Sequence, residues 1–387
     1  MKKKGNMIYV GFFFVLCLIP SVGMLLPQTR GSATENRKLA LWPQLRTEEG
    51  WNTDFLSEAG EYFQDHFGFR QQLVTANALI NGKIFGVSTA DGVIQGKNGW
   101  LYYKDSLSDY LGTEPMSERA LFNVAHTLSM MQDYTEKSGA KFLFTIAPNK
   151  NTLYGENMPY YDSMIVSEDK NMDRIEAYLE KENVNYVNLK EILESSDEVL
   201  YHERDSHWNN KGAALAGDAL MTALDKEHTD YTQESYEKCV DFTGDLDEML
   251  YPLALTEEKE IYYDKADVFA CVGEVESNFD PKITTVNPGS TGSLVMYRDS
   301  FGNAILPFFA NSYANAYFSR GIPYQMTDIA EHQADTVIVE RAERFLLEMA
   351  ENPPQMEAPQ LTVGAVMEPG MEENARGTVT AEVQGDL

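Results

Sequence analysis

The segment GSLVMYRDS, residues 292–300, is followed directly by FGNAILPFFANSY (301–313) and ANAYFSR (314–320). The first and last pieces are short and rich in apolar and aromatic residues, as buried strands are, whereas the middle piece is long enough for a helix. A strand, a helix and a second strand joined in this way predict a right-handed βαβ unit, in which the two strands lie parallel in one sheet.

Strand-like and helical patterns alternate before and after this unit. Such alternation indicates successive strands connected by helices, so we predict an α/β fold with three layers and a mostly parallel sheet. Further upstream, residues 53–86 predict one or two amphipathic helices and residues 91–106 predict a hairpin. The expected strands are 141–148, 184–189, 292–300, 314–320 and 334–342, and the expected helices are 117–139, 171–183, 210–228, 301–313 and 325–333.

The charge of the chain limits its partners. The 387 residues carry a formal net charge of −29, which repels phosphate backbones, so nucleic acid is not an expected partner. Hydrophobic residues make up 43% of the chain, which indicates a globular protein with a sizeable core.

The N-terminus predicts export. MKKK precedes an apolar run with no charged residue from Gly5 to Thr29, long enough to span a membrane. We expect a cytoplasmic stub at 1–7, a transmembrane anchor or signal at 8–27, and the rest of the chain outside the cytoplasm. The competing interpretation is a signal peptide cleaved after the small residues at 21–23, which would give a secreted protein.

The exported part predicts one large domain and a tail. We expect the domain at 28–350, with 227–288 as an insertion or a lid because its pattern is weak, acidic and tyrosine-rich. Residues 351–387 carry seven acids and one arginine and predict a flexible, solvated tail. Cys239 and Cys271 could pair in an oxidising compartment or stay as free buried thiols.

The segment YHERDSHWNN, residues 201–210, contains the most reactive set of side chains. We expect Asp205 and His207 in a loop that leaves a strand and enters a predicted helix, and Ser300 at the turn between another predicted strand and helix. The carboxyl ends of parallel strands are where open α/β sheets bind ligands. A serine needs an imidazole to take its proton and a carboxylate to orient that imidazole, so these three residues predict a nucleophilic triad.

Other interpretations of the same residues stay open. An isolated Asp-x-His is often a structural cap, and a serine at a helix start is often an N-cap. His202, Asp205 and His207 have side chains that can bind a metal, but no further histidine or cysteine set accompanies them. Asn149 and Lys150, at the exit of a predicted strand, are placed either to bind an oxyanion or substrate or to serve as ordinary turn residues.

Several blocks resemble a known family. DSHWN, and RDSFGN about ninety residues later, are similar to the SGNH-hydrolase-like proteins that acetylate exported polysaccharides, of the alginate O-acetylation type, and to their DHHW-protein relatives. The likeness extends over most of 35–350 through ENRKLA, QDHFGFR, GKNGWLYY and IAPNK. It implies Ser300 as nucleophile, His207 as general base and Asp205 as the orienting carboxylate, in the reverse of the usual SGNH chain order. Arg298 departs from the family pattern, in which a glycine often precedes the Asp-Ser pair.

The resemblance also implies a function. It favours an extracytoplasmic, serine-dependent O-acetyltransferase or acetylesterase acting on a cell-surface or exported polysaccharide, without metal or cofactor. A membrane-bound O-acyltransferase would supply the acyl donor. A catalytically silent glycan-binding module and, less favoured, a metal-dependent hydrolase are the alternatives.

Overall fold

The computed structural model describes residues 7, 9–15, 18, 23, 40–47 and 50–357. Within these residues, no helix is both long and apolar enough to cross a membrane. The anchor or signal expected at 8–27 lies largely outside the described residues, as does most of the tail expected at 351–387. Both stay predictions.

A seven-stranded mixed sheet forms the centre of the fold, with the order β6-β5-β13-β11-β12-β10-β9. The five strands from β6 to β12 are parallel, as expected, whereas β10 pairs antiparallel with β12 and β9 pairs antiparallel with β10. The two antiparallel strands come from the segment 227–288, whose pattern was too weak to predict them. The strands are β5 (Lys141–Ala147), β6 (Tyr186–Val187), β9 (Ala270–Cys271), β10 (Lys282–Val286), β11 (Thr291–Tyr297), β12 (Tyr313–Ser319) and β13 (Thr336–Ala342).

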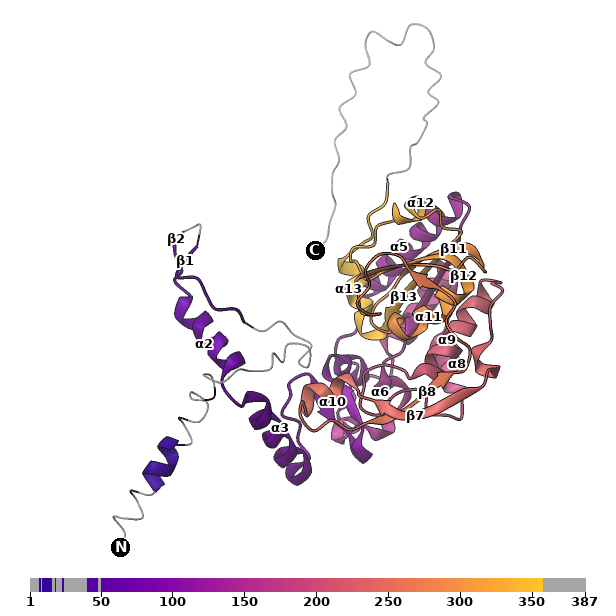
Figure 1. The fold of residues 1–387 in the computed structure, drawn as a ribbon. Helices are drawn as coiled ribbons and strands as arrows, with labels where there is room; N and C mark the ends of the chain where they lie inside the picture. Colours follow the sequence, from indigo (N-terminus) through magenta and orange to yellow (C-terminus); the bar gives the residue numbers. More distant parts are fainter. Residues whose placement is uncertain are drawn as a thin grey trace, which may run out of the picture. The chain divides into compact units, whose positions relative to one another are not determined.

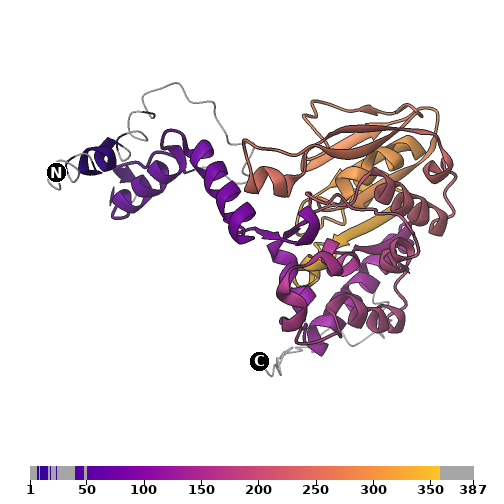
Figure 2. The same ribbon diagram turned by 90° about the horizontal axis from the view of Figure 1, so that it is seen from below.

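Helices cover both faces of this sheet (Figure 1, and from below in Figure 2). In β11, Leu294 and Met296 pack into the core cluster that includes α9 and α11, whereas the neighbouring buried residues Val295 and Tyr297 face the other way, as the alternation of a strand requires. The three-layer α/β architecture is therefore confirmed. Helices α8 (Leu189–Glu194), α9 (Asn210–Ala223) and α11 (Gly302–Ser312) pack on one side, and α5 (Glu118–Lys137), α7 (Asn171–Lys181) and α13 (Leu346–Glu351) on the other.

The predicted unit at 292–320 is present as β11, α11 and β12. The two strands pair in parallel, from Thr291 opposite Tyr313 to Tyr297 opposite Ser319. The other expected strands and helices are present as well, although β6 has only two residues and the helix expected at 325–333 only four, α12 (Asp328–Glu331).

Smaller elements lie around the sheet. The expected hairpin is confirmed as β3 (Val93–Gln95) and β4 (Leu101–Tyr103), and 53–86 forms two helices, α2 (Phe55–His66) and α3 (Arg70–Ile80), the second continuing as a π-turn, Asn81–Phe85. The segment 227–288 also forms a second hairpin with a helix between its strands. The remaining elements are β1 (Arg46–Thr47), β2 (Gly50–Trp51), α4 (Leu107–Leu111), α6 (Lys150–Leu153), β7 (Tyr236–Phe242), α10 (Asp245–Leu250), β8 (Glu258–Tyr263) and short 3-10 turns.

The two cysteines of the domain are free thiols. Cys239 lies in β7 and is partly buried, whereas Cys271 lies in β9 and is exposed. The structure therefore shows neither the disulfide nor the pair of buried thiols that the sequence left open.

Candidate active site

Loops that follow β5, β11 and β13 meet at the carboxyl edge of the parallel strands. The register places Ala147, the end of β5, beside Ala342, the end of β13, and Tyr297, the end of β11, beside Val339 of the same strand. Ser300 therefore stands at the edge where α/β sheets present their ligand sites.

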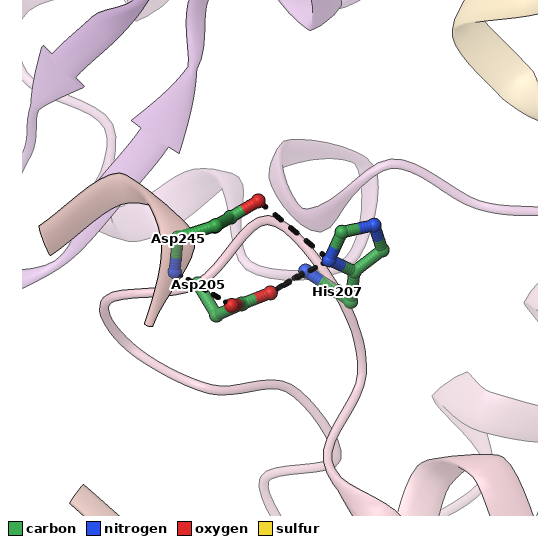
Figure 3. Close-up of side chains that lie close together, drawn as sticks. All are labelled: Asp205, His207 and Asp245. Carbon is green, nitrogen blue, oxygen red and sulfur yellow. Dashed lines mark hydrogen bonds and ion pairs between the residues drawn. The ribbon is translucent and has the colours of Figure 1, made fainter. Parts of the chain in front are cut away.

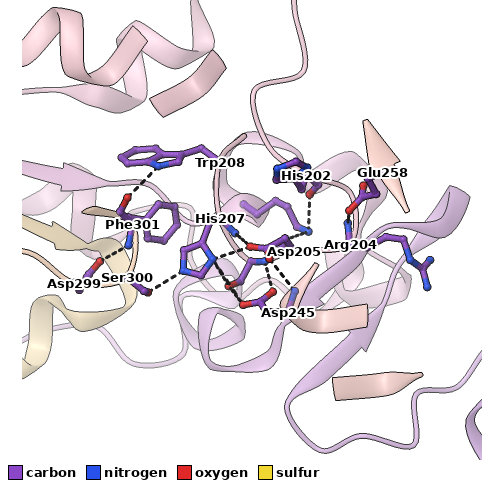
Figure 4. A network of polar contacts seen from close by, with 12 residues as sticks. His202, Arg204, Asp205, His207, Trp208, Asp245, Glu258, Asp299, Ser300 and Phe301 are labelled. Atoms are coloured by element: carbon purple, nitrogen blue, oxygen red, sulfur yellow. Dashed lines mark hydrogen bonds and ion pairs between the residues drawn. The ribbon is translucent and has the colours of Figure 1, made fainter. Parts of the chain in front are cut away.

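The turn that carries Ser300 is held by the carboxylate of Asp299 (Figure 4). One carboxylate oxygen accepts the N–H of Phe301 at 2.9 Å, and the other accepts the N–H of Ala342 at 2.6 Å. The N–H of Asp299 itself donates to Glu340 at 3.0 Å, and burial raises the pKa of the Glu340 carboxyl well above its ordinary value. These bonds tie the turn to the end of β13 and leave Ser300 half-buried in front of α11.

Arg298 does not obstruct the turn. Its buried guanidinium donates to the Asn303 side chain and to the carbonyls of Asn278 and Asp280, at 3.0 and 3.1 Å. A Cβ on Gly302 would come within 2.6 Å of the Arg298 Cβ, so the close approach at this turn depends on the glycine at 302.

Asp205 and His207 lie on a loop between α8 and α9, which Tyr201 and Trp208 close as an isolated bridge. The sequence placed this pair after a strand of the sheet, and that part of the prediction is wrong.

Lys150, which is 4% exposed, holds this loop in place. Its ammonium donates to the carbonyls of His202, Glu203 and Asp205, at 3.1, 3.0 and 2.5 Å.

The structure brings the three predicted triad residues together. His207 Nε2 lies 2.8 Å from Ser300 Oγ, and His207 Nδ1 lies 2.7 Å from Asp205 Oδ1 (Figure 4). Asp205 is fixed in turn, because it accepts the N–H of His207 and the N–H of Asp245, both at 2.8 Å. Serine, imidazole and carboxylate thus form one hydrogen-bonded line, the arrangement that activates a serine hydroxyl.

A second carboxylate, which the sequence did not predict, approaches the same histidine. Asp245, the first residue of α10, lies 3.7 Å from His207 Nδ1 (Figure 3). The hydroxyl of Ser206 donates to Asp245 at 2.6 Å and lies 3.1 Å from His207 Nδ1. The acidic character of 227–288 is the one sequence signal for this residue, and it does not single out Asp245 among its neighbours.

The two carboxylates determine the protonation of the site. Burial alone would lower the pKa of His207, but the attraction of Asp205 and Asp245 outweighs it, so the pKa is raised. Burial would raise the pKa of Asp205, but His207 and the hydrogen bonds from backbone N–H groups hold it well below its ordinary value. The imidazolium that forms when His207 takes a proton is therefore stabilised.

Asp205, His207 and Asp245 also have side chains of the types that bind metals, with ligand atoms within 4.8 Å of one another. They already engage one another and Ser206 through hydrogen bonds, which orient the imidazole. The set proposed from the sequence is not assembled, because His202 Nε2 donates to the Glu260 carboxylate at 2.9 Å and the His202 ring stacks on Phe242.

Asn149 and Lys150 face the protein interior. Asn149 is fully buried, receives no solvent contact, and bonds to Glu343 through its N–H (2.8 Å) and to Asp109 through its side-chain amide (3.1 Å). The Lys150 ammonium donates to three carbonyls, so both side chains make internal contacts here, and their role in binding an oxyanion or substrate stays a prediction.

Comparison with known proteins supports the resemblance drawn from the sequence. Residues 93–268 match the family model of the SGNH hydrolase-like domain, acetyltransferase AlgX, a range that includes Asp205 and His207 and ends before Ser300. The probable alginate O-acetylase AlgJ of Pseudomonas syringae pv. tomato is 24% identical over 178 residues, which are 45% of this chain and 43% of the relative. The match thus spans less than half the length of that relative.

Two solved structures share the fold. A DHHW family protein from Eubacterium siraeum superposes with a TM-score of 0.51 and 16% identity, over 68% of this chain and 99% of that one. Bacillus cereus PatB1 gives a TM-score of 0.51 and 16% identity, over 66% of this chain and 96% of that one. The chain therefore shares the α/β fold of these two proteins, and residues 93–268 are similar to the SGNH hydrolase-like domain of acetyltransferase AlgX.

Proposed function

We propose that the protein is an extracytoplasmic O-acetyltransferase or acetylesterase that acts on a cell-surface or exported polysaccharide. Ser300 is the nucleophile, His207 the general base and Asp205 the carboxylate that orients the base. The observation that carries this proposal is the unbroken hydrogen-bonded line from Asp205 through His207 to Ser300.

The reaction follows from these contacts. Ser300 Oγ attacks the carbonyl carbon of an acetyl ester while its proton passes to His207 Nε2. The tetrahedral intermediate collapses, the ester C–O bond breaks, and the leaving alcohol takes the proton back from His207. An acceptor hydroxyl then repeats the sequence on the acetyl-serine, giving a new ester and free Ser300, whereas water in its place gives acetate.

The relatives suggest the direction of transfer. The names of AlgX and AlgJ describe an acetyltransferase and an alginate O-acetylase, which favours a sugar hydroxyl over water as acceptor. In this scheme the acyl donor is delivered across the membrane by a membrane-bound O-acyltransferase. The alternative, a silent glycan-binding module, uses the same residues without turnover and is separated from the proposal by the experiment below.

The decisive experiment measures turnover and covalent labelling together. Ser300→Ala and His207→Ala are each expected to abolish hydrolysis of 4-nitrophenyl acetate, because the residues of a triad act as a unit. Asp205→Asn is expected to cost a large but smaller factor, since the imidazole remains in place though misoriented. The matched control is Ser195→Ala, which removes an exposed hydroxyl outside the site.

Labelling shows which serine reacts. A sulfonyl fluoride is expected to add one adduct to the wild-type protein by intact mass, and none to Ser300→Ala; PatB1, which shares the fold, has been solved with a sulfonyl adduct. Equal labelling of both proteins, or full activity of Ser300→Ala, would refute the triad. Loss of activity in EDTA and its return with zinc would favour the metal-dependent hydrolase instead.

A further inference from the structure

Arg344 is a cation beside the triad that the proposed reaction has not yet used. It follows β13 in the 3-10 turn Glu343–Phe345, at the sheet edge that carries Ser300. Its guanidinium carbon lies 5.2 Å from the ring centre of Phe301, the residue after Ser300. The Phe301 ring also packs edge-on against His207, the proposed general base, with 4.9 Å between the ring centres. Arg344 and His207 thus both contact Phe301.

Aromatic rings hold this guanidinium in place. Its carbon lies 5.4 Å from the ring centre of Tyr103 and 4.9 Å from that of Phe345, in addition to Phe301. Three cation–π contacts position a charged group without neutralising it. The positive charge of Arg344 also acts on the imidazole, since Arg344 is among the groups that lower the pKa of His207.

Among the described residues no carboxylate lies within ion-pair distance of Arg344, although its charge opposes the rise that burial causes in the pKa of the Asp109 carboxyl. Its single hydrogen bond there is a long one, from Nη1 to Asn149 Oδ1 at 3.4 Å, and Nε is buried with no acceptor. An arginine that is half-buried usually pairs with a carboxylate, because a desolvated charge without a partner is costly. This guanidinium therefore keeps donor capacity for another group.

The customary donors near Ser300 are already occupied. The N–H of Phe301 is bound by Asp299, the Asn149 side chain is buried against Asp109, and the Lys150 ammonium is saturated by three carbonyls. The backbone N–H of Ser300 makes no hydrogen bond to the part of the chain that the structure describes. The N–H of Gly302 likewise has no partner there, so the turn itself keeps neutral backbone donors for a tetrahedral intermediate.

We propose that Arg344 adds a charged donor to these N–H groups, binding the oxyanion that forms when Ser300 attacks the ester carbonyl. This inference rests on the proposed function, because it assigns a role within the same acyl transfer. A half-buried guanidinium held by aromatic rings is positioned before the reaction, so it can attract the developing negative charge without rearranging. Arginine is suited to this position because its planar group stacks on rings while its N–H edge stays free.

The test uses a neutral substrate, so that no charge on the ester can explain the result. Arg344→Met keeps an apolar stem among the three rings and removes the guanidinium. It is expected to lower kcat for 4-nitrophenyl acetate by about 10²-fold with little change in KM, the loss typical of an oxyanion donor. Arg46→Met is the matched control, because Arg46 also lies over an aromatic ring, Trp51, but on an exposed strand.

Chemical rescue separates a donor from a structural role. Turnover by Arg344→Ala is expected to rise at least about tenfold when guanidinium chloride replaces sodium chloride at equal ionic strength and below denaturing concentration, and Arg344→Lys is expected to keep part of the activity. Rates are compared at the pH plateau of each variant, because loss of this positive charge also raises the pKa of His207. The thermal unfolding midpoint of each variant is measured in both salts. A midpoint that does not rise in guanidinium chloride shows that the gain in turnover is not due to refolding.

Two outcomes would overturn the inference. Wild-type kcat in Arg344→Met on the neutral ester would show that no oxyanion contact is lost. A defect confined to esters that carry an anionic group would make Arg344 a substrate-binding residue instead. If Ser300→Ala is inactive while Arg344→Met is fully active, this inference fails and the proposed function stands; if Ser300→Ala is active, the proposed function itself fails.

Discussion

At the scale of single residues, the site is organised around the imidazole of His207. One nitrogen faces Ser300 and the other faces two acidic side chains, Asp205 in direct contact and Asp245 behind Ser206. Opposite charges close to an imidazole favour its protonated form, whereas a general base must begin neutral. Activity should therefore depend on pH in a way that each carboxylate influences.

We predict that Asp245→Asn extends activity to lower pH. In the wild-type protein kcat/KM falls as the pH drops through the raised pKa of His207, because the protonated imidazole cannot accept the serine proton. Removing the charge of Asp245 destabilises the imidazolium and lowers that pKa, which should shift the acid limb down by on the order of one pH unit. The profile of kcat/KM against pH for 4-nitrophenyl acetate measures the shift.

The control for this shift lies on the same helix. Glu248→Gln removes one negative charge from α10, but Glu248 interacts with Asp245 and Asp205 and is not among the main groups that act on His207 itself. Its acid limb should move less than that of Asp245→Asn. An acid limb that is unchanged or moved upward in Asp245→Asn would contradict the role assigned to Asp245.

At the scale of elements, the start of α10 lies directly on the loop that carries the triad acid and base. Gly244, which precedes the helix, is so close that an added Cβ would lie 2.2 Å from the carbonyl oxygen of Arg204 and 2.7 Å from the N–H nitrogen of Asp205. These neighbours are backbone atoms, which cannot rotate away. The contact allows Asp245 to donate its N–H to Asp205 and so links 227–288 to the catalytic loop.

We predict that Gly244→Ala lowers kcat for 4-nitrophenyl acetate at least about tenfold and destabilises the fold by about 1–3 kcal/mol, as overpacking does. The methyl group must push α10 away from the loop, which breaks the bond from Asp245 to Asp205 and frees the imidazole. Turnover and the thermal unfolding midpoint are the measurements. Gly60→Ala, in α2 with nothing near its added Cβ, should be neutral or slightly stabilising; equal effects of the two substitutions would refute the packing argument.

At the scale of the whole molecule, a strongly acidic chain follows an apolar N-terminal run. The formal net charge of −29 disfavours polyanionic partners such as nucleic acid, and the three lysines of MKKK precede a run that lacks charged residues from Gly5 to Thr29. These features suit a domain displayed outside the cytoplasm on a membrane anchor.

We predict that the exported protein stays with the membrane. The apolar run is longer than the core of an ordinary signal peptide, so cleavage is not expected. After cell fractionation, the protein should resist extraction by alkaline carbonate and dissolve in detergent. A mature N-terminus near Met24, found by protein sequencing, would show a cleaved signal and a secreted protein.

Local pattern was sufficient for the five parallel strands of the sheet and for the triad candidates. Strands such as β5 and β13 are buried on both faces, and therefore read as continuous apolar runs that need no knowledge of their partners. Asp205, His207 and Ser300 could be chosen over the helix caps that Asp and Ser often form because a nucleophilic triad needs a carboxylate, an imidazole and a hydroxyl, and because DSHWN and RDSFGN resemble a family that uses them. The short strands β9 and β10 could not be found in this way, because two and five residues are too few to show a period and they exist through pairing with one another and with β12.

The tertiary structure alone decided which distant groups surround that triad. Asp245 reaches His207 because α10 packs on the catalytic loop, and Arg344 reaches the Ser300 turn because β13 lies beside β11. It also shows that Lys150, which the sequence left as either a substrate ligand or an ordinary turn residue, supports the loop of Asp205 and His207 through three carbonyls. No local pattern contains this information, because the partner of a buried charge is determined by how the whole sheet and its loops pack. An unpaired charge is also unfavourable only once folding has removed it from water.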